Sequence, residues 1–206
     1  MESRIDWDYV FGGNDSFKKA TAFSNETYGE VKPILVSKII QHLNITSKDV
    51  FYDLGSGIGN VAMQISIETG CKSIGIEKEL VHHMAALRLL EQCDKFEPEI
   101  AQRVNLWRQD LIHPTLDITN ATIIFMNNWC FDQDLHTHLL DHFSTLHDGT
   151  FIICTKELFG QRNSCNSKKR NKAATFLQQR ESIKGPINGV SWTNNPIDCF
   201  VYIKTG

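Results

Sequence analysis

The segment Val50-Phe-Tyr-Asp-Leu-Gly-Ser-Gly-Ile-Gly-Asn-Val61 holds the residues whose types and spacing point most directly to chemistry. A short apolar stretch ends in Asp53, and the alternating glycines Gly55, Gly57 and Gly59 follow it. Glycines at this spacing allow a tight turn and a close approach of the backbone to a ligand. An acid ahead of them favours a cofactor with a positive amino group over one led by a pyrophosphate. The pattern therefore favours S-adenosylmethionine, and with it methyl transfer.

A dehydrogenase is the natural alternative for a glycine-rich turn. The dinucleotide fingerprint Gly-x-Gly-x-x-Gly would need a glycine at Asn60, and Asp53 would face the pyrophosphate. Two further acids stand at the ends of predicted strands: Glu77 ends the second, and Asp110 follows the third. Open α/β sheets bind ligands at these ends. We expect Glu77 to accept hydrogen bonds from ribose hydroxyls and Asp110 from the adenine amino group, and Asp53 to pair with an ammonium group.

A second candidate group follows the predicted fourth strand, in Phe125-Met-Asn-Asn-Trp-Cys-Phe131. Its aromatic residues Phe125, Trp129 and Phe131 can line an apolar channel for an aliphatic stem, and a ring face stabilises a cation. The segment has no proline, unlike the Asn-Pro-Pro-Tyr motif of many base methylating enzymes, which argues against a nucleobase substrate. For Phe125 alone, a place in the core of the sheet is an equally good interpretation.

Alternating strands and helices must position these residues. Apolar patterns predict strands over 50–53, 72–77, 104–107, 121–126 and 150–154, and helices over 31–43, 59–69, 80–93 and 132–143. Segments 189–192 and 198–203 flank an Asn-Asn-Pro turn and are expected to form a closing antiparallel pair. The sequence thus predicts an α/β fold: a mostly parallel seven-stranded sheet, with helices on both faces and a closing antiparallel strand.

The composition limits the class of protein. The chain has 206 residues, a net charge of −3 and 41% hydrophobic residues, as expected for one globular domain. We expect residues 1–24 to be a polar lead-in and 25–206 the domain itself. No apolar run is long enough to span a membrane. Six scattered cysteines without a Cys-x-x-Cys pair indicate reduced thiols in a cytosolic or nuclear protein. His138 and His142 have metal-ligand spacing but no evident third ligand, so no metal site is expected.

Four motifs follow one another along the chain. They are Tyr28-Gly-Glu30, Asp53-Leu-Gly-Ser-Gly-Ile-Gly59, Ile124-Phe-Met-Asn-Asn-Trp-Cys-Phe131 and Val190-Ser-Trp-Thr193, supported by Gly75-Ile-Glu77-Lys78. Together they resemble the non-SET histone lysine methyltransferases of the disruptor-of-telomeric-silencing type, over residues 23–204. Many methyltransferases share the glycine motif, whereas the other three are more specific. The resemblance implies a class I S-adenosylmethionine-dependent methyltransferase fold, with a loop around residues 27–31 that covers the cofactor.

The resemblance also implies roles for single residues. Asn127 would lie beside the transferred methyl group, and S-adenosyl-L-homocysteine would be the product. Phe125, Phe131 and Trp192 would line the lysine channel. Cys199 stands where relatives usually carry a channel tyrosine. The expected cofactor-binding residues are Tyr28, Gly29, Glu30, Asp53, Gly55, Ser56, Gly57, Gly59, Asn60, Glu77, Asp110, Leu111 and Asn127.

The implied substrate is a lysine in the globular core of histone H3 on the nucleosome, which implies a chromatin regulator in the nucleus. Because the net charge is negative, any nucleic-acid contact needs a local patch. The candidates for contact with DNA phosphates are Lys168, Lys169, Arg170 and Lys172. Two alternatives remain open: a class I methyltransferase for another protein or a small molecule, and a non-catalytic binding module. The intact acids and Asn127 argue against the second.

Overall fold

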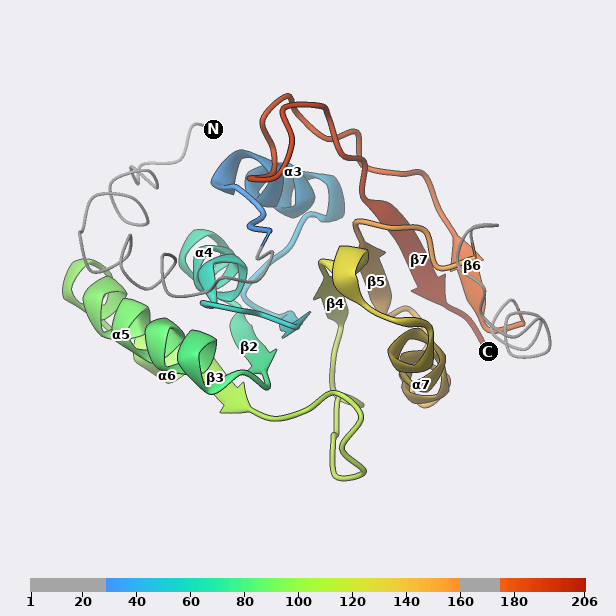
Figure 1. The fold of residues 1–206 in the computed structure, drawn as a ribbon, viewed down its shortest axis with the longest axis horizontal. Helices are drawn as coiled ribbons and strands as arrows, with labels where there is room; N and C mark the ends of the chain where they lie inside the picture. Colours follow the sequence, from blue (N-terminus) through green and yellow to red (C-terminus); the bar gives the residue numbers. More distant parts are fainter. Residues whose placement is uncertain (1–28, 160–174) are drawn as a thin grey trace.

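A computed structural model describes residues 29–159 and 175–206 of the chain. They form a seven-stranded sheet in the order β3-β2-β1-β4-β5-β7-β6 (Figure 1). Its strands are β1 (Val50–Leu54), β2 (Lys72–Glu77), β3 (Val104–Arg108), β4 (Ile123–Met126), β5 (Phe151–Cys154), β6 (Leu177–Gln179) and β7 (Phe200–Lys204). The helices are α3 (Pro33–Leu43), α4 (Asn60–Thr69), α5 (Leu80–Phe96), α6 (Ile100–Arg103), η1 (Asn128–Cys130) and α7 (Gln133–Phe143).

Strands β1 to β5 are parallel, and β7 is antiparallel to both β5 and β6. The chain builds outward from β1 to β2 and β3, then returns to the other side of β1 as β4. This reversal of strand order opens a crevice at the carboxyl ends of β1 and β4, the usual ligand site of such sheets.

Side chains alternate between the two faces of the sheet and build a core on each face. Phe51, Phe125 and Ile153 pack with α3 and α4, whereas their neighbours Tyr52 and Ile124 pack with α7. Helices α3 and α4 lie on one side of the sheet, and α7 lies on the other (Figure 1). The segment between β3 and β4 adds Leu111, Leu116 and Ile118 to the α7 side. A third small core joins α4, α5, α6 and β3 around Met63, Leu89, Cys93, Ile100 and Val104.

Local signals set where the helices begin and end. Pro33 occupies the first turn of α3, and Asn44 ends that helix in the left-handed conformation. Helix α4 begins after Gly59, whose φ of 77° is also left-handed. The carboxylate of Asp132 caps α7 by accepting a hydrogen bond from the Leu135 N–H at 2.8 Å.

The predicted α/β fold and the alternation of elements are confirmed, with most boundaries shifted by a few residues. The predicted pairing of 189–192 with 198–203 is wrong. The hydrogen-bonding edges of β7 are both occupied, by β5 and by β6. Segment 189–192 instead lies antiparallel to the residues just before α3, with Val190 opposite Val31.

Within the described residues, no helix is both long and apolar enough to cross a membrane. The predicted lead-in at 1–24 and the basic run at 168–172 lie outside the described residues.

Candidate functional site

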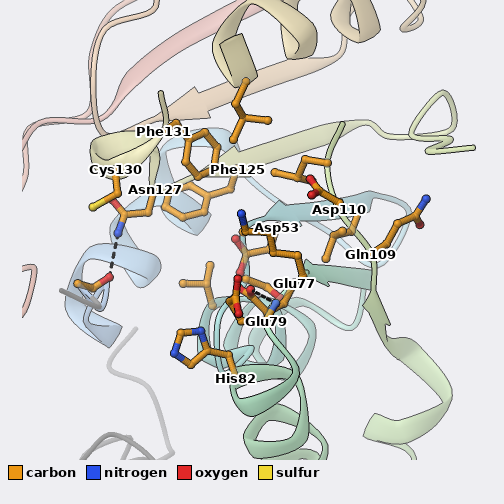
Figure 2. Close-up of a pocket in the computed structure, with 18 of the residues that line it drawn as sticks. Asp53, Glu77, Glu79, His82, Gln109, Asp110, Phe125, Asn127, Cys130 and Phe131 are labelled. Atoms are coloured by element: carbon orange, nitrogen blue, oxygen red, sulfur yellow. Dashed lines mark hydrogen bonds between the residues drawn. The ribbon is translucent and has the colours of Figure 1, made fainter. Parts of the chain in front are cut away.

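A cavity of about 310 Å³ opens at the carboxyl ends of β1, β2 and β4. In Figure 2, Asp53 and Glu77 lie at its centre. Gln109 and Asp110 lie toward one end, and Asn127 lies toward the other with two phenylalanines. Predicted site residues that line the cavity are Gly29, Asp53, Gly55, Ser56, Asn60, Glu77, Asp110, Leu111, Phe125, Asn127 and Phe131.

The turn between β1 and α4 forms the floor of the cavity. The N–H groups of Gly55 and Ser56 both donate to the carbonyl oxygen of Ile76 at 2.9 Å, so the turn is tied to the end of β2. Gly55 has a φ of +80°, which favours glycine, and an added Cβ there would lie 3.1 Å from the Phe131 ring. Gly75 on β2 also has to be small, because an added Cβ would lie 2.8 Å from the Ser56 hydroxyl.

Asp53 carries a buried carboxyl group beside the cavity. Its residue is only 2% exposed, and none of the ion pairs found among the described residues involves it. Burial, reinforced by the charge of Glu77, raises the pKa of Asp53 to about 8, although a backbone N–H from α4 opposes the shift. A positively charged group placed in this cavity would therefore find a strong partner.

Glu77 is held in one orientation by the backbone. One carboxylate oxygen accepts from the Gly57 N–H at 2.9 Å, and the other accepts from the Glu79 N–H at 2.8 Å. A carboxylate offers about four acceptor sites, so two remain for a ligand in the cavity. This geometry suits the diol of a ribose. Gly57 does not line the cavity itself, and it contributes by orienting the Glu77 carboxylate.

The far end of the cavity is formed after β3. The Gln109 N–H donates to the Glu77 carbonyl oxygen at 3.1 Å, which holds this segment against β2. One oxygen of Asp110 accepts from the Ile112 N–H at 3.2 Å, and Leu111 is buried beneath it. The combination of an apolar side chain and a carboxylate suits a flat heterocycle with an amino group.

Asn127 is fixed from two sides at the end of β4. Its Nδ2 donates to the Gly29 carbonyl oxygen at 2.9 Å, and its Oδ1 accepts from the Thr155 hydroxyl at 2.7 Å. The next residue, Asn128, is fully buried and exchanges hydrogen bonds with the backbone of Lys156. The double asparagine therefore has one member in the cavity wall and one that locks β4 to the end of β5.

The predicted channel residues separate into two groups. Phe125 and Phe131 line the cavity, and Phe125 is fully buried. Trp192 lies outside the lining and stacks edge-on with Trp129, their ring centroids 6.3 Å apart.

Cys199 lies in the core next to α3 and is not among the residues that line the cavity, so its expected place in a lysine channel stays a prediction. It is fully buried, and its backbone N–H and carbonyl oxygen both form hydrogen bonds with the backbone of Ile183. Burial, with the charge of Asp198 adding to it, raises the pKa of the Cys199 thiol to about 12, so the thiol stays neutral. Among the remaining expected residues, Glu30 and Gly59 do not line the cavity, and Tyr28 is outside the described residues.

Several lining residues were not expected from the sequence. They are Val31, Val61, Ile76, Lys78, Glu79, His82, Gln109, Cys130, Asp132 and Leu135. Most of them directly follow a strand end or begin a helix. A rule that includes the first turn after each parallel strand would have found most of them, but not Ile76 within β2 or Val31 before α3.

The two histidines with metal-ligand spacing bond to each other. Their Nε2 atoms are 3.1 Å apart on α7, so one ring donates to the other. No group of three or more His, Cys, Asp or Glu side chains with the geometry of a metal site occurs in residues 29–159 and 175–206.

Solved structures with the same fold include several class I methyltransferases. An RNA methyltransferase from Salinibacter ruber, crystallised with S-adenosyl-L-homocysteine, superposes with a TM-score of 0.60 at 16% identity. The match covers 85% of this chain and 93% of that chain. This likeness establishes the class I methyltransferase fold for the present chain.

Sequence relatives are more specific. A Kluyveromyces lactis protein, "Histone-lysine N-methyltransferase, H3 lysine-79 specific", is 32% identical over 206 residues, 91% of this chain and 34% of that protein. A Caenorhabditis elegans protein with the same name is 33% identical over 187 residues, 85% of this chain and 19% of that protein. The chain thus spans about a third of the length of the first relative and about a fifth of the second. The family model "Histone methylation protein DOT1" matches residues 9–205, and the chain therefore belongs to the DOT1 family.

Proposed function

We propose that this chain is the catalytic domain of a histone lysine N-methyltransferase, with residues 25–206 as one domain. It transfers a methyl group from S-adenosylmethionine to a lysine in the globular core of histone H3 on the nucleosome, in the nucleus. Membership of the DOT1 family and the names of the relatives support this substrate. The observation that carries the proposal is the cavity with the buried Asp53 carboxyl at its centre.

The residues along the cavity match the successive parts of S-adenosylmethionine. Asp53 would pair with the ammonium of the methionine part, which offsets the cost of burying this carboxylate. Glu77 would accept from the ribose hydroxyls with its two free acceptor sites. Leu111 and Asp110 would hold the adenine by an apolar contact and a hydrogen bond. The turn at 55–57 lets the backbone approach the ligand closely.

Transfer requires a neutral lysine amine, whereas free lysine has a pKa of about 10.4. When bound, S-adenosylmethionine supplies an electrophilic methyl group on a positive sulfonium. The rings of Phe125 and Phe131 exclude water at this end of the cavity, and desolvation lowers the pKa of an amine. Asn127, held by Gly29 and Thr155, gives the amine a fixed polar neighbour. Alignment of this kind can supply roughly 7–11 kcal/mol of the barrier in favourable cases.

Contact with nucleosomal DNA is a separate part of the proposal. The basic run Lys168, Lys169, Arg170 and Lys172 has the composition of a phosphate-binding segment in a chain of net charge −3. Replacing all four with alanine should weaken nucleosome binding and reduce the slope of log affinity against log salt by about 0.9 per lost contact. An unchanged slope would remove this run from the DNA interface.

Labelled S-adenosylmethionine offered with nucleosomes, free histones and a cell extract tests the function. Labelling of nucleosomal H3 supports the proposal, labelling of another target redirects it to a different acceptor, and no labelling at all contradicts it. Asp53→Ala and Asn127→Ala should each abolish labelling. The exposed Asp94→Ala on α5 and Asn105→Ala on β3 are matched controls that should retain it.

A further inference from the structure

Residues 29–32, here called the strap, cross the cavity between two other parts of the chain. Gly29 and Val31 line the cavity. On this side the Gly29 carbonyl oxygen accepts from Asn127, and the Val31 carbonyl oxygen accepts from the Asn60 Nδ2 at 3.0 Å. Both asparagines also line the cavity. A ligand in the cavity therefore touches the strap and both side chains that hold it.

The other edge of the strap holds residues 186–196, here called the tryptophan loop. The Ser191 N–H donates to the Glu30 carbonyl oxygen at 2.9 Å, and the Glu30 N–H donates to the Ser191 hydroxyl at 2.8 Å. The Lys32 N–H donates to the Gly189 carbonyl oxygen at 2.9 Å. The strap thus pairs with the tryptophan loop much as an edge strand pairs with its neighbour.

These bonds are the main polar attachment of the tryptophan loop. The other hydrogen bonds of residues 186–196 found in the described part of the chain stay inside the loop: Asn188 to Asn194, Gly189 to Pro186, and Asn195 to Thr193. The loop's base is fixed just outside it, where Asp198 pairs with Lys184 at 2.6 Å. Val190 and Trp192 also pack against the core beside α3, so the polar part of the loop's attachment depends on the strap.

The strap also contacts the indole of Trp192 directly. A Cβ added to Gly29 would overlap the Trp192 ring, so only glycine lets the backbone approach the indole this closely. Trp192 in turn meets Trp129, which is 46% exposed at the surface. One residue of the strap thus contacts the cavity, Asn127 and the aromatic pair at the surface.

From this connectivity we infer that the strap couples the two substrates of the reaction: a ligand in the cavity fixes the strap, and the strap fixes the tryptophan loop for the acceptor. Ser191 is the positioning residue of this coupling, because its N–H and hydroxyl both bond to Glu30. The inference rests on the proposed function for the identity of the ligand and the acceptor. Coupling of this kind is reciprocal, so the acceptor also tightens cofactor binding.

Hydrogen exchange of the full chain, with and without S-adenosyl-L-homocysteine, tests the coupling without any catalysis. In the unmodified chain, the ligand should protect residues 29–32 and also 188–192. Ser191→Ala should retain ligand binding within about threefold but reduce the protection at 188–192, because it removes the hydroxyl bond to Glu30 and keeps the two backbone bonds. Ser191→Thr keeps the hydroxyl and should restore the protection. Ser144→Ala, which removes a hydroxyl bond at the end of α7, is the matched control and should change neither region.

The KM for nucleosomes gives a second readout, because a general loss of stability would lower the amount of active enzyme without changing KM. At saturating S-adenosylmethionine, Ser191→Ala should raise the KM for nucleosomes at least about fivefold, while the Kd for S-adenosyl-L-homocysteine measured without nucleosomes changes little. Protection of 29–32 alone in the unmodified chain would overturn the coupling and leave the proposed function standing. Failure of the ligand to bind at all would overturn both. Because the first comparison needs no variant, poor folding of Ser191→Ala does not affect it.

Discussion

At the scale of single residues, charge and hydrogen bonding decide what each side chain at this site can bind. Asp53 is the clearest case, because its carboxyl group is buried with a raised pKa near a second acid, Glu77. A pKa raised above 3.8 means that ionising Asp53 costs stability, a cost absent below pH 4 and complete above pH 8. A cationic ligand removes that cost, so its binding releases a proton at pH values below 8.

This linkage predicts a pH-dependent affinity. The Kd for S-adenosyl-L-homocysteine should fall between pH 6 and pH 7.5, by at most about tenfold per pH unit, since more Asp53 is already ionised at higher pH. Asp53→Asn should bind weakly and with no such slope. Calorimetry across this range provides the measurement. Parallel slopes for the two proteins would show that another group carries the pH dependence.

The Thr155 hydroxyl lies 2.7 Å from the Asn127 Oδ1 and 3.5 Å from the Asn128 Oδ1, so its main hydrogen bond is to Asn127. Thr155→Val keeps the shape but leaves the Asn127 Oδ1 without its donor, at a cost of about 1–3 kcal/mol if the amide stays in place. We expect kcat to fall about tenfold, with the Kd for S-adenosyl-L-homocysteine nearly unchanged. Thr155→Ser should recover most of the rate. Thr145→Val at the exposed end of α7 is the control; an equal loss there would make the effect nonspecific.

At the scale of elements, the turn between β1 and α4 decides the shape of the cavity floor. Its glycines adopt left-handed conformations, and Gly55 also lies against Phe131. Gly55 therefore has to satisfy two requirements. Its positive φ affects the stability of the fold, and its lack of a side chain leaves room for the Phe131 ring beside the cavity.

A pair of glycine variants separates them. Gly149 has a φ of +91° in the turn before β5, and an added Cβ would meet nothing within 4 Å. Gly55→Ala and Gly149→Ala should each lower the free energy of unfolding by roughly 1–2 kcal/mol, the usual cost of this conformation. Only Gly55→Ala should also weaken cofactor binding, because it displaces Phe131. Equal binding in both variants would show that the Phe131 contact is unimportant.

At the scale of the whole molecule, the sheet brings together segments that are far apart in the sequence. The reversal of strand order at β1 and β4 places the strap, the glycine turn and the end of β4 around one cavity (Figure 1, Figure 2). A ligand in that cavity contacts most of the structural elements at once, so its binding should stabilise the entire fold.

Ligand-induced stabilisation is therefore expected. S-adenosyl-L-homocysteine at a hundred times its Kd should add about 2.7 kcal/mol to the free energy of unfolding. For a chain of this size, that raises Tm by roughly 5–10 °C. Thermal unfolding monitored by circular dichroism measures it, with Asp53→Ala at the same ligand concentration as the control. A similar rise in Tm for Asp53→Ala would place the ligand elsewhere on the protein.

Much of the fold followed from local patterns. The apolar runs predicted β1 to β5 and the long helices. A strand or helix with a buried face repeats its apolar residues every two to four positions, and this repeat is visible within a single segment. Strand β6 was missed because Leu177-Gln-Gln179 is short and two of its residues are exposed. Its strand character comes only from pairing with β7.

By itself, the sequence determined the type of sheet, the glycine turn with Asp53 ahead of it, and the acids at successive strand ends, since each depends on neighbours within a few residues. The tertiary structure alone decided that Cys199 is core, that Thr155 orients Asn127, and that Ser191 joins the tryptophan loop to the strap. The Asn127–Gly29 and Glu30–Ser191 bonds link residues 98 and 161 positions apart. Contacts over such separations form only when the sheet assembles and brings these segments together, so no local sequence pattern predicts them.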